Sequence, residues 1–86
     1  MDFSHALLLL KEGKKLTRSG WNGKGMWVEL QIPDNGSKMT RPYIFMNVPY
    51  GSSSQLEELK NAIGLDRIPW IASQTDLMSY DWEEMA

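Results

Sequence analysis

The start of the chain has apolar residues at helical spacing. Four of them recur at i, i+3, i+4 and i+7, which puts their side chains on one face of a helix. These four are Phe3, Ala6, Leu7 and Leu10. Asp2 can cap this helix and Gly13 can end it. Leu8 and Leu9 fall outside the apolar face, so we expect more apolar surface than a small monomer covers, which indicates a contact between subunits.

Alternating positions then predict an antiparallel meander. Residues 15–18 fit a short strand, and residues 26–31 alternate as a strand with two different faces should. Asp34, Asn35 and Gly36 form a strong turn signal between that strand and a third one at residues 42–48.

A helix is predicted at residues 54–63, where Ser54 and Glu57 form a capping box. Gly51 and the serines after it could instead form a phosphate-binding nest. Glu57 already occupies the positive end of the helix, however, which favours the capping interpretation.

A second capping box, formed by Ser73 and Asp76, opens a short helix that runs to Ser79, and residues 80–85 can return as an edge strand. Pro69 keeps Ile68 extended before this helix. The predicted fold class is therefore α+β: a small antiparallel meander with an N-terminal helix packed on it and one or two short helices inserted. With 86 residues, no repeats and no long linker, the chain is expected to be one domain, 1–86.

Composition narrows the possible partners. Nine Lys and Arg against eleven Asp and Glu give a net charge of −2 with the signs interspersed, which argues against a nucleic acid polymer. No stretch is apolar enough to predict a membrane span, and the absence of cysteine fits a reducing cytoplasm. His5 has no second His or Cys to share a metal, so we expect neither metal nor cofactor.

Two tryptophan-bearing stretches stand out. Residues 20–26 hold three glycines beside Trp21, with Trp27 following and Lys24 adding a positive charge. Exposed backbone N–H groups, one cation and flat indoles suit a small anionic ligand with a ring. The alternative is a hairpin whose tryptophans are simply core. The polar residues beside Trp21 and Trp70 are neutral kinds that orient a ligand. They are Asn22, Ser73, Gln74 and Thr75.

Catalysis is not supported by the residues present. A hydrolase or transferase needs a nucleophile with its base, a metal cluster, or paired carboxylates in a pocket, and the sequence assembles none of these. Asp76, the best placed acid, has a structural role at its capping box.

The two stretches together resemble a family of small phage-encoded proteins, long classed as a domain of unknown function, that includes Thoeris anti-defence proteins of the second type. The matching motifs are Gly-Trp-Asn-Gly-Lys-Gly-Met at 20–26, Pro-Trp-Ile-Ala-Ser-Gln-Thr-Asp-Leu at 69–77 and Asp-Trp at 81–82. The first helix matches as well, whereas residues from about 32 to 68 follow no fixed pattern.

The resemblance implies a sponge that binds a cyclic ADP-ribose variant made by the host's Thoeris sensor, without cleaving it, in the cytoplasm of the infected bacterium. It also implies a homo-oligomer, with a tetramer as the state that the family suggests. Members are described as binding cyclic oligonucleotide signals at a separate site. The binding residues implied by the motifs are Trp21, Asn22, Gly23, Lys24, Met26, Trp70, Ser73, Gln74, Thr75 and Asp76.

Trp27 and Trp82 are the tryptophans that could instead be core. Two other functions stay open on the sequence alone. One is a peptide-binding or protein-binding module that uses exposed aromatic side chains, and the other is a small enzyme acting on a nucleotide.

Overall fold

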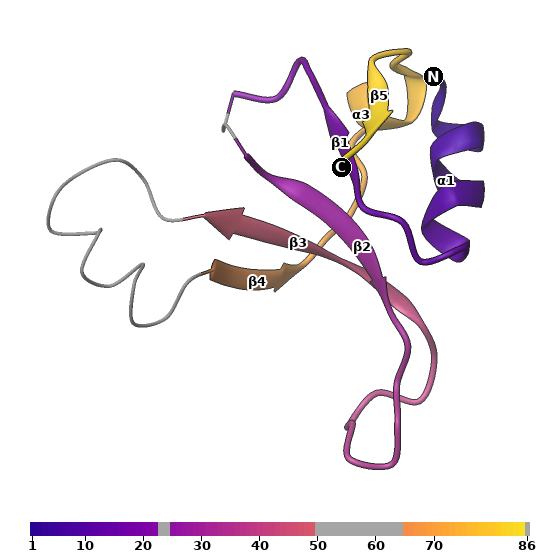
Figure 1. The fold of residues 1–86 in the computed structure, drawn as a ribbon, viewed down its shortest axis with the longest axis vertical. Helices are drawn as coiled ribbons and strands as arrows, with labels where there is room; N and C mark the ends of the chain where they lie inside the picture. The colour runs from indigo at the N-terminus through magenta and orange to yellow at the C-terminus, as the bar shows by residue number, and fades with distance from the viewer. Residues whose placement is uncertain (23–24, 50–64, 86) are drawn as a thin grey trace, which may run out of the picture.

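A computed structural model describes residues 1–22, 25–49 and 65–85. The predicted helix at residues 54–63, and Gly23 and Lys24, lie outside these described residues. The described elements are α1 (Phe3–Lys11), β1 (Leu16–Arg18), β2 (Trp27–Gln31), β3 (Tyr43–Pro49), β4 (Leu65–Pro69), α3 (Gln74–Met78) and β5 (Trp82–Glu84). The strands form one antiparallel sheet in the order β4-β3-β2-β1-β5, so the predicted α+β meander is confirmed (Figure 1).

The helix α1 forms where the apolar pattern predicts it. The Asp2 side chain accepts a hydrogen bond from the His5 backbone N–H at 2.9 Å, and Gly13 adopts a φ of +88° just beyond the helix. Leu8 is 60% exposed. The expectation that Leu9 also lies outside the core face is wrong, because Leu9 is half-buried and packs against the core.

The core lies between α1 and one face of the sheet. Its fully buried side chains come from the helix and from three neighbouring strands, on which α1 packs. They are Ala6, Leu10, Leu16, Val28 and Trp82. Because side chains alternate along a strand, Trp27, Glu29 and Asn47 point to the opposite face. Trp82 is therefore core, as the sequence allowed, whereas Trp27 is half-buried on the other side of the sheet.

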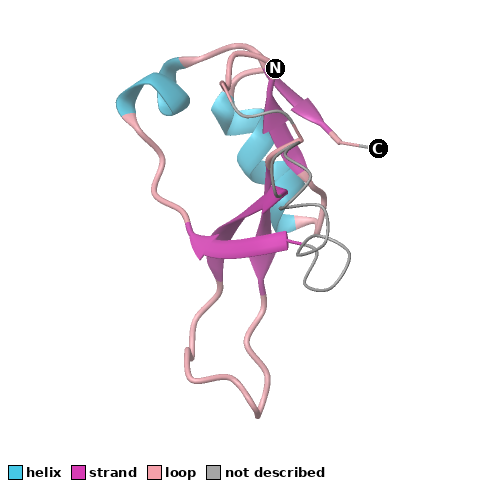
Figure 2. Cartoon of the chain, turned by 90° about the vertical axis from the view of Figure 1, so that its left-hand side faces the viewer, coloured by secondary structure: helices cyan, strands magenta, loops and turns pink. Residues whose placement is uncertain are grey.

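The connection between β2 and β3 projects beyond the sheet (Figures 1 and 2). Its predicted turn is present: the Gly36 N–H donates to Asp34 Oδ1 at 2.9 Å, and the Ser37 N–H donates to the Asp34 carbonyl at 3.1 Å.

The strand β4 is not predicted by the sequence beyond the extended backbone at Ile68. It lies at the sheet edge with four of its five residues exposed, so no alternation of buried positions marks it. No helix in the described part of the chain is both long and apolar enough to cross a membrane.

Two leucines of α1 give a matched test of this packing. Leu10→Ala removes a fully buried side chain and is expected to lower the free energy of unfolding by about 2–5 kcal/mol. Leu8→Ala removes an exposed one and should change it by less than about 0.5 kcal/mol. Urea denaturation followed by circular dichroism measures both, and equal losses would contradict the orientation of α1.

Candidate ligand-binding site

An aromatic cluster occupies one end of the core. Trp82, 1% exposed, lies at its centre with ring centroids 5.3 Å from Trp21, 5.4 Å from Phe3 and 5.9 Å from Trp70. Trp21 and Trp70 are themselves in edge-to-face contact at 6.3 Å, and both are half-buried. Residues 49 positions apart in the sequence are thus brought together because each packs on the same buried indole.

The capping box predicted at Ser73 and Asp76 is present and fixes the polar side of this cluster. Ser73 Oγ accepts from the Asp76 N–H at 3.0 Å, while Asp76 Oδ2 accepts from the Ser73 N–H at 2.9 Å. The Trp82 indole N–H donates to the Asp76 carbonyl oxygen at 2.9 Å. The start of α3 is therefore anchored directly to the centre of the cluster.

Arg18, at the end of β1, joins the two candidate stretches through ion pairs. Its Nη1 lies 2.7 Å from Asp76 Oδ1, and its Nε lies 2.7 Å from Asp81 Oδ1. Asp76 Oδ1 also accepts from the Trp21 indole N–H at 3.0 Å. One guanidinium thus holds two carboxylates, and one of these carboxylates holds an indole of the cluster.

Hydrogen bonding keeps these groups ionised. The Arg18 guanidinium, helped by the Gly20 N–H and opposed by burial, lowers the pKa of Asp81. Burial acts to raise the pKa of Asp76, but hydrogen bonds from Trp21, Ser73 and Arg18 together lower it. The hydrogen bond to Asp81 is the main cause that raises the pKa of Arg18, and the hydrogen bond to Asp76 raises it further. Burial acts in the opposite direction but does not outweigh them.

The structure explains why glycine is needed at two positions of the predicted loop, Gly20 and Gly25. The Gly20 N–H donates to Asp81 Oδ2 at 2.7 Å, and a Cβ at Gly20 would lie 2.6 Å from that oxygen, so a larger residue would push the carboxylate away. Gly25 has a φ of +76°, the left-handed region that favours glycine.

The structure places the remaining candidates around this cluster. Asn22 is exposed directly after Trp21, and Ser73, Gln74 and Thr75 are exposed at the start of α3. Met26 is half-buried before β2, where its carbonyl accepts from Thr17 Oγ1 at 2.7 Å.

Sequence reasoning gave no role to Arg18, Asp81 or Phe3 at the site, although the first two lie within or beside the tryptophan motifs. The sequence shows only that the basic residue Arg18 precedes the motif at 20–26 and that the acidic residue Asp81 belongs to the Asp-Trp motif at 81–82. Pairing between residues 63 positions apart has no periodicity that would reveal it.

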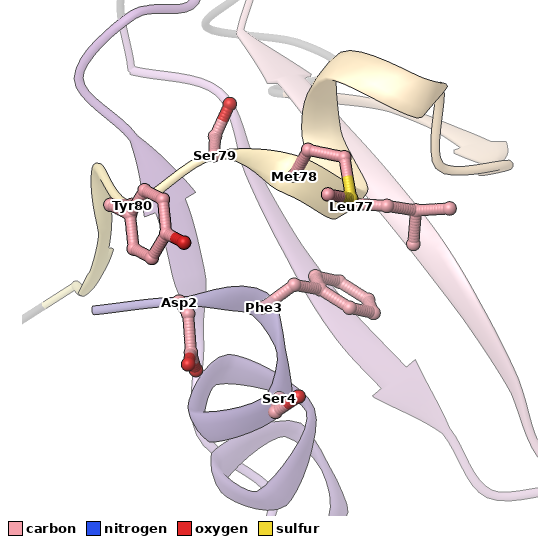
Figure 3. A pocket seen from close by; sticks show the side chains of 7 residues that line it. All are labelled: Asp2, Phe3, Ser4, Leu77, Met78, Ser79 and Tyr80. Atoms are coloured by element: carbon pink, nitrogen blue, oxygen red, sulfur yellow. The ribbon is translucent and has the colours of Figure 1, made fainter.

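A shallow hollow of about 160 Å³ lies next to the cluster, between the start of α1 and the end of α3. Phe3 of α1 and Leu77 of α3 both line it, and Tyr80 lies beside Asp2 (Figure 3). Pockets for whole small molecules are typically about 300–1,000 Å³, so this hollow could hold only part of a nucleotide. Among the described residues, no three acidic, His or Cys side chains form a group that could hold a metal ion.

The fold and the cluster together define the class of protein: a small α+β protein in which a partly buried ion network holds half-buried tryptophans beside a capped helix. Residues 1–85 match the family model of the Tad2-like domain, described as a Thoeris anti-defense 2-like domain. The chain is 33% identical over 92 residues to Thoeris anti-defense 2 of Bacillus phage SP01, with 96% of this chain and 92% of that protein covered. The chain belongs to the Thoeris anti-defense 2 family, which confirms the resemblance seen in the sequence.

The ion network predicts how stability depends on pH. Because the pKa values of Asp76 and Asp81 are lowered by folding, their contribution is fully present above the unfolded value of about 3.9 and is lost as the pH falls through the folded values. Asp76→Asn should lower the free energy of unfolding at pH 7 by about 1.5–3 kcal/mol. Asp76→Asn should also flatten the decline of the free energy of unfolding as the pH falls below about 4.

Denaturant titrations from pH 7 to 2 measure both effects. Glu12→Gln, at the exposed end of α1, is the control and should follow the wild-type curve. If Asp76→Asn also follows it, the network does not stabilise the fold.

Proposed function

We propose that this protein is a sponge that sequesters a cyclic ADP-ribose-type signal made by the host Thoeris system, in the cytoplasm of the infected bacterium. The observation that carries the proposal is the paired Trp21 and Trp70 beside the exposed start of α3, in a chain of the Thoeris anti-defense 2 family. Both stretches that the family resemblance implicates meet there. The function follows from tight binding without any chemical step.

The groups around the cluster suit the parts of such a ligand. A purine can stack on an indole, and ribose hydroxyls can be met by the side chains of Asn22 and Gln74. Thr75 adds a hydroxyl on the same exposed turn. Asp76 acts through its neighbours, because its carboxylate already accepts from Arg18, Trp21 and Ser73.

The pyrophosphate needs donors, and the contacts of the described residues restrict which ones. The N–H groups of Gly20 and Trp21 already donate to Asp81 and to the Arg18 carbonyl, respectively. We therefore assign the anionic part of the ligand to Gly23 and Lys24, with Met26 at the end of the same loop. This assignment follows the family motif.

A second copy of the chain would supply the rest of the pocket. The hollow of about 160 Å³ covers only part of a nucleotide, and a small chain has little surface with which to enclose one. We propose a homo-oligomer, a tetramer on family grounds, in which each ligand lies between subunits. Cyclic oligonucleotides at a separate site are a further proposal that rests on the family alone.

Sequestration requires affinity rather than speed. A dissociation constant of about 10 nM corresponds to roughly −11 kcal/mol, and related complexes differ mainly in their off-rates. The ion pairs of Arg18 and the capping box hold the cluster rigid before the ligand arrives, which lowers the entropy cost of binding.

Replacing either indole tests the site. Trp21→Ala and Trp70→Ala should each weaken binding of the cyclic ADP-ribose signal by about 1–3 kcal/mol, roughly five- to 150-fold, because stacking is lost. Trp27→Ala is the matched control, since Trp27 lies on the opposite face of the sheet. Isothermal titration calorimetry measures the affinities, and circular dichroism establishes that each variant is folded. Wild-type affinity in both folded variants would place the site elsewhere.

Capture without turnover is tested by recovering the ligand. The protein is saturated with the cyclic signal, incubated, freed of unbound ligand and heat-denatured. Chromatography should return the intact cyclic molecule, still able to activate its effector, because no nucleophile, metal-bound water or separated carboxylate pair is expected. Linear ADP-ribose accumulating with time would show an enzyme instead. A wild-type chain that binds no cyclic nucleotide but retains a peptide would favour the protein-binding alternative.

A further inference from the structure

The turn between β2 and β3 contains Asn35 followed by Gly36, a pair that the proposed function does not use. Both residues are exposed, and both lie outside the motifs at 20–26, 69–77 and 81–82. Figures 1 and 2 show this connection at the opposite end of the molecule from α3 and β5. Any role of the pair must therefore come from its own chemistry.

The fold does not require glycine at position 36. A Cβ on Gly36 would lie 3.5 Å from Asp34 Oδ1, which is an ordinary van der Waals distance. Among the described glycines, Gly13 and Gly25 have a positive φ and Gly36 does not, so its backbone conformation is open to other residues. The missing side chain has a different effect: it leaves the Gly36 nitrogen open to a close approach by the preceding side chain.

The Asn35 side chain is the group that can make this approach. It is exposed, and it forms no hydrogen bond with any described residue. Asn47 is the opposite case, because its side chain is 1% exposed, donates to Glu29 and accepts from Arg67. Of these two side chains, Asn35 has the rotational freedom that a reaction with the next residue requires.

We propose that Asn35 is a site of spontaneous deamidation through a cyclic imide formed with the Gly36 nitrogen. Asparagine is among the thermally labile residues of proteins. The Gly36 N–H gives its proton to water and the nitrogen forms a bond to Asn35 Cγ. The bond from Cγ to Nδ2 breaks, and the leaving group takes a proton from water and departs as ammonia. Water then opens the ring at either of its carbonyl groups, which gives aspartate or isoaspartate at position 35.

Asp34 restrains the nitrogen that has to attack. The Gly36 N–H donates to Asp34 Oδ1 at 2.9 Å, and the Ser37 hydroxyl donates to the same oxygen at 3.1 Å. Loss of the N–H proton would break the first of these hydrogen bonds and set a negative nitrogen beside a negative carboxylate. The hydrogen bond that organises the turn therefore also slows the reaction.

Deamidation changes this end of the molecule and leaves the candidate site as it is. The product adds one negative charge to the net charge of −2. Isoaspartate also lengthens the backbone, so the hydrogen bonds of the Asp34 turn are expected to shift. Because β2 ends at Gln31 and β3 begins at Tyr43, the pairing of the strands lies outside the altered segment. This inference and the proposed function can therefore fail independently.

Peptide mapping tests the modification. The wild-type protein is incubated in mildly alkaline buffer, and timed samples are digested with trypsin, which places Asn35 in peptide 25–38 and Asn47 in peptide 39–60. Asn22, which also precedes a glycine, falls in another peptide and does not enter the comparison. Mass spectrometry should show conversion of amide to acid at Asn35, as two products of equal mass that chromatography separates, while Asn47 stays unmodified.

Two substitutions test the roles assigned to the turn. Gly36→Ala adds a methyl group beside the attacking nitrogen and should remove most of the acidic product formed in the same period. Asp34→Ala removes the carboxylate and should speed deamidation by about two- to tenfold, the range that one hydrogen bond represents. Thr40→Ala, at an exposed position of the same connection, is the matched control and should react at the wild-type rate.

Circular dichroism establishes that each variant is folded. In the wild-type protein, an unmodified Asn35, a single product from it, or equally fast conversion at Asn47 would overturn the proposal. A folded Gly36→Ala variant that reacts at the wild-type rate would do the same, because the ring would not form through that nitrogen. Asp34→Ala without a faster reaction would overturn the restraint assigned to Asp34.

Discussion

The ion network of Arg18, Asp76 and Asp81 is the constraint on which the arrangement of the molecule depends. It connects the end of β1 to the cap of α3 and to the residue before β5, segments about 60 positions apart. The Arg18 and Asp76 side chains are each only 10% exposed, so their charges are largely desolvated. A buried pair of this kind adds little net stability, but an arrangement that separated its members would leave a charge buried and unpaired. We interpret the network as a device that selects one packing of the tryptophans.

Trp82 connects the ion network to the aromatic cluster. Its ring is the common contact of Phe3, Trp21 and Trp70, while its indole N–H donates to the Asp76 carbonyl. The apolar and polar halves of the site are thus fixed by one side chain. A chain of 86 residues has a small core, and here the side chain at the centre of the candidate site, Trp82, is also a core residue. A substitution among these residues is therefore expected to affect stability as well as the proposed binding.

The parts that the sequence predicts correctly have local causes. The caps at Asp2 and Ser73 and the turn at Asp34 need only residues two or three apart, and the structure contains all of them. The strand β4 and the pairing of Arg18 with Asp81 depend instead on contacts across the sheet and along the whole chain, which no spacing records. The half-burial of Leu9 has the same origin, because the helical period gives a face but not the width of the partner that covers it.

The glycine motif shows how one pattern supports two explanations. From the sequence, glycines beside a tryptophan favour exposed backbone N–H groups that could hold an anion. At Gly20, the described contact is internal: the N–H holds Asp81, and the missing side chain makes room for that carboxylate. Asp81 Oδ2 accepts the hydrogen bond that the Gly20 N–H could otherwise donate to an anion, and Arg18 balances the charge of this carboxylate. This part of the motif therefore supports the aromatic cluster from within, and the function proposed above draws its polar ligand contacts from the residues that follow Trp21 and from the exposed turn that begins at Ser73.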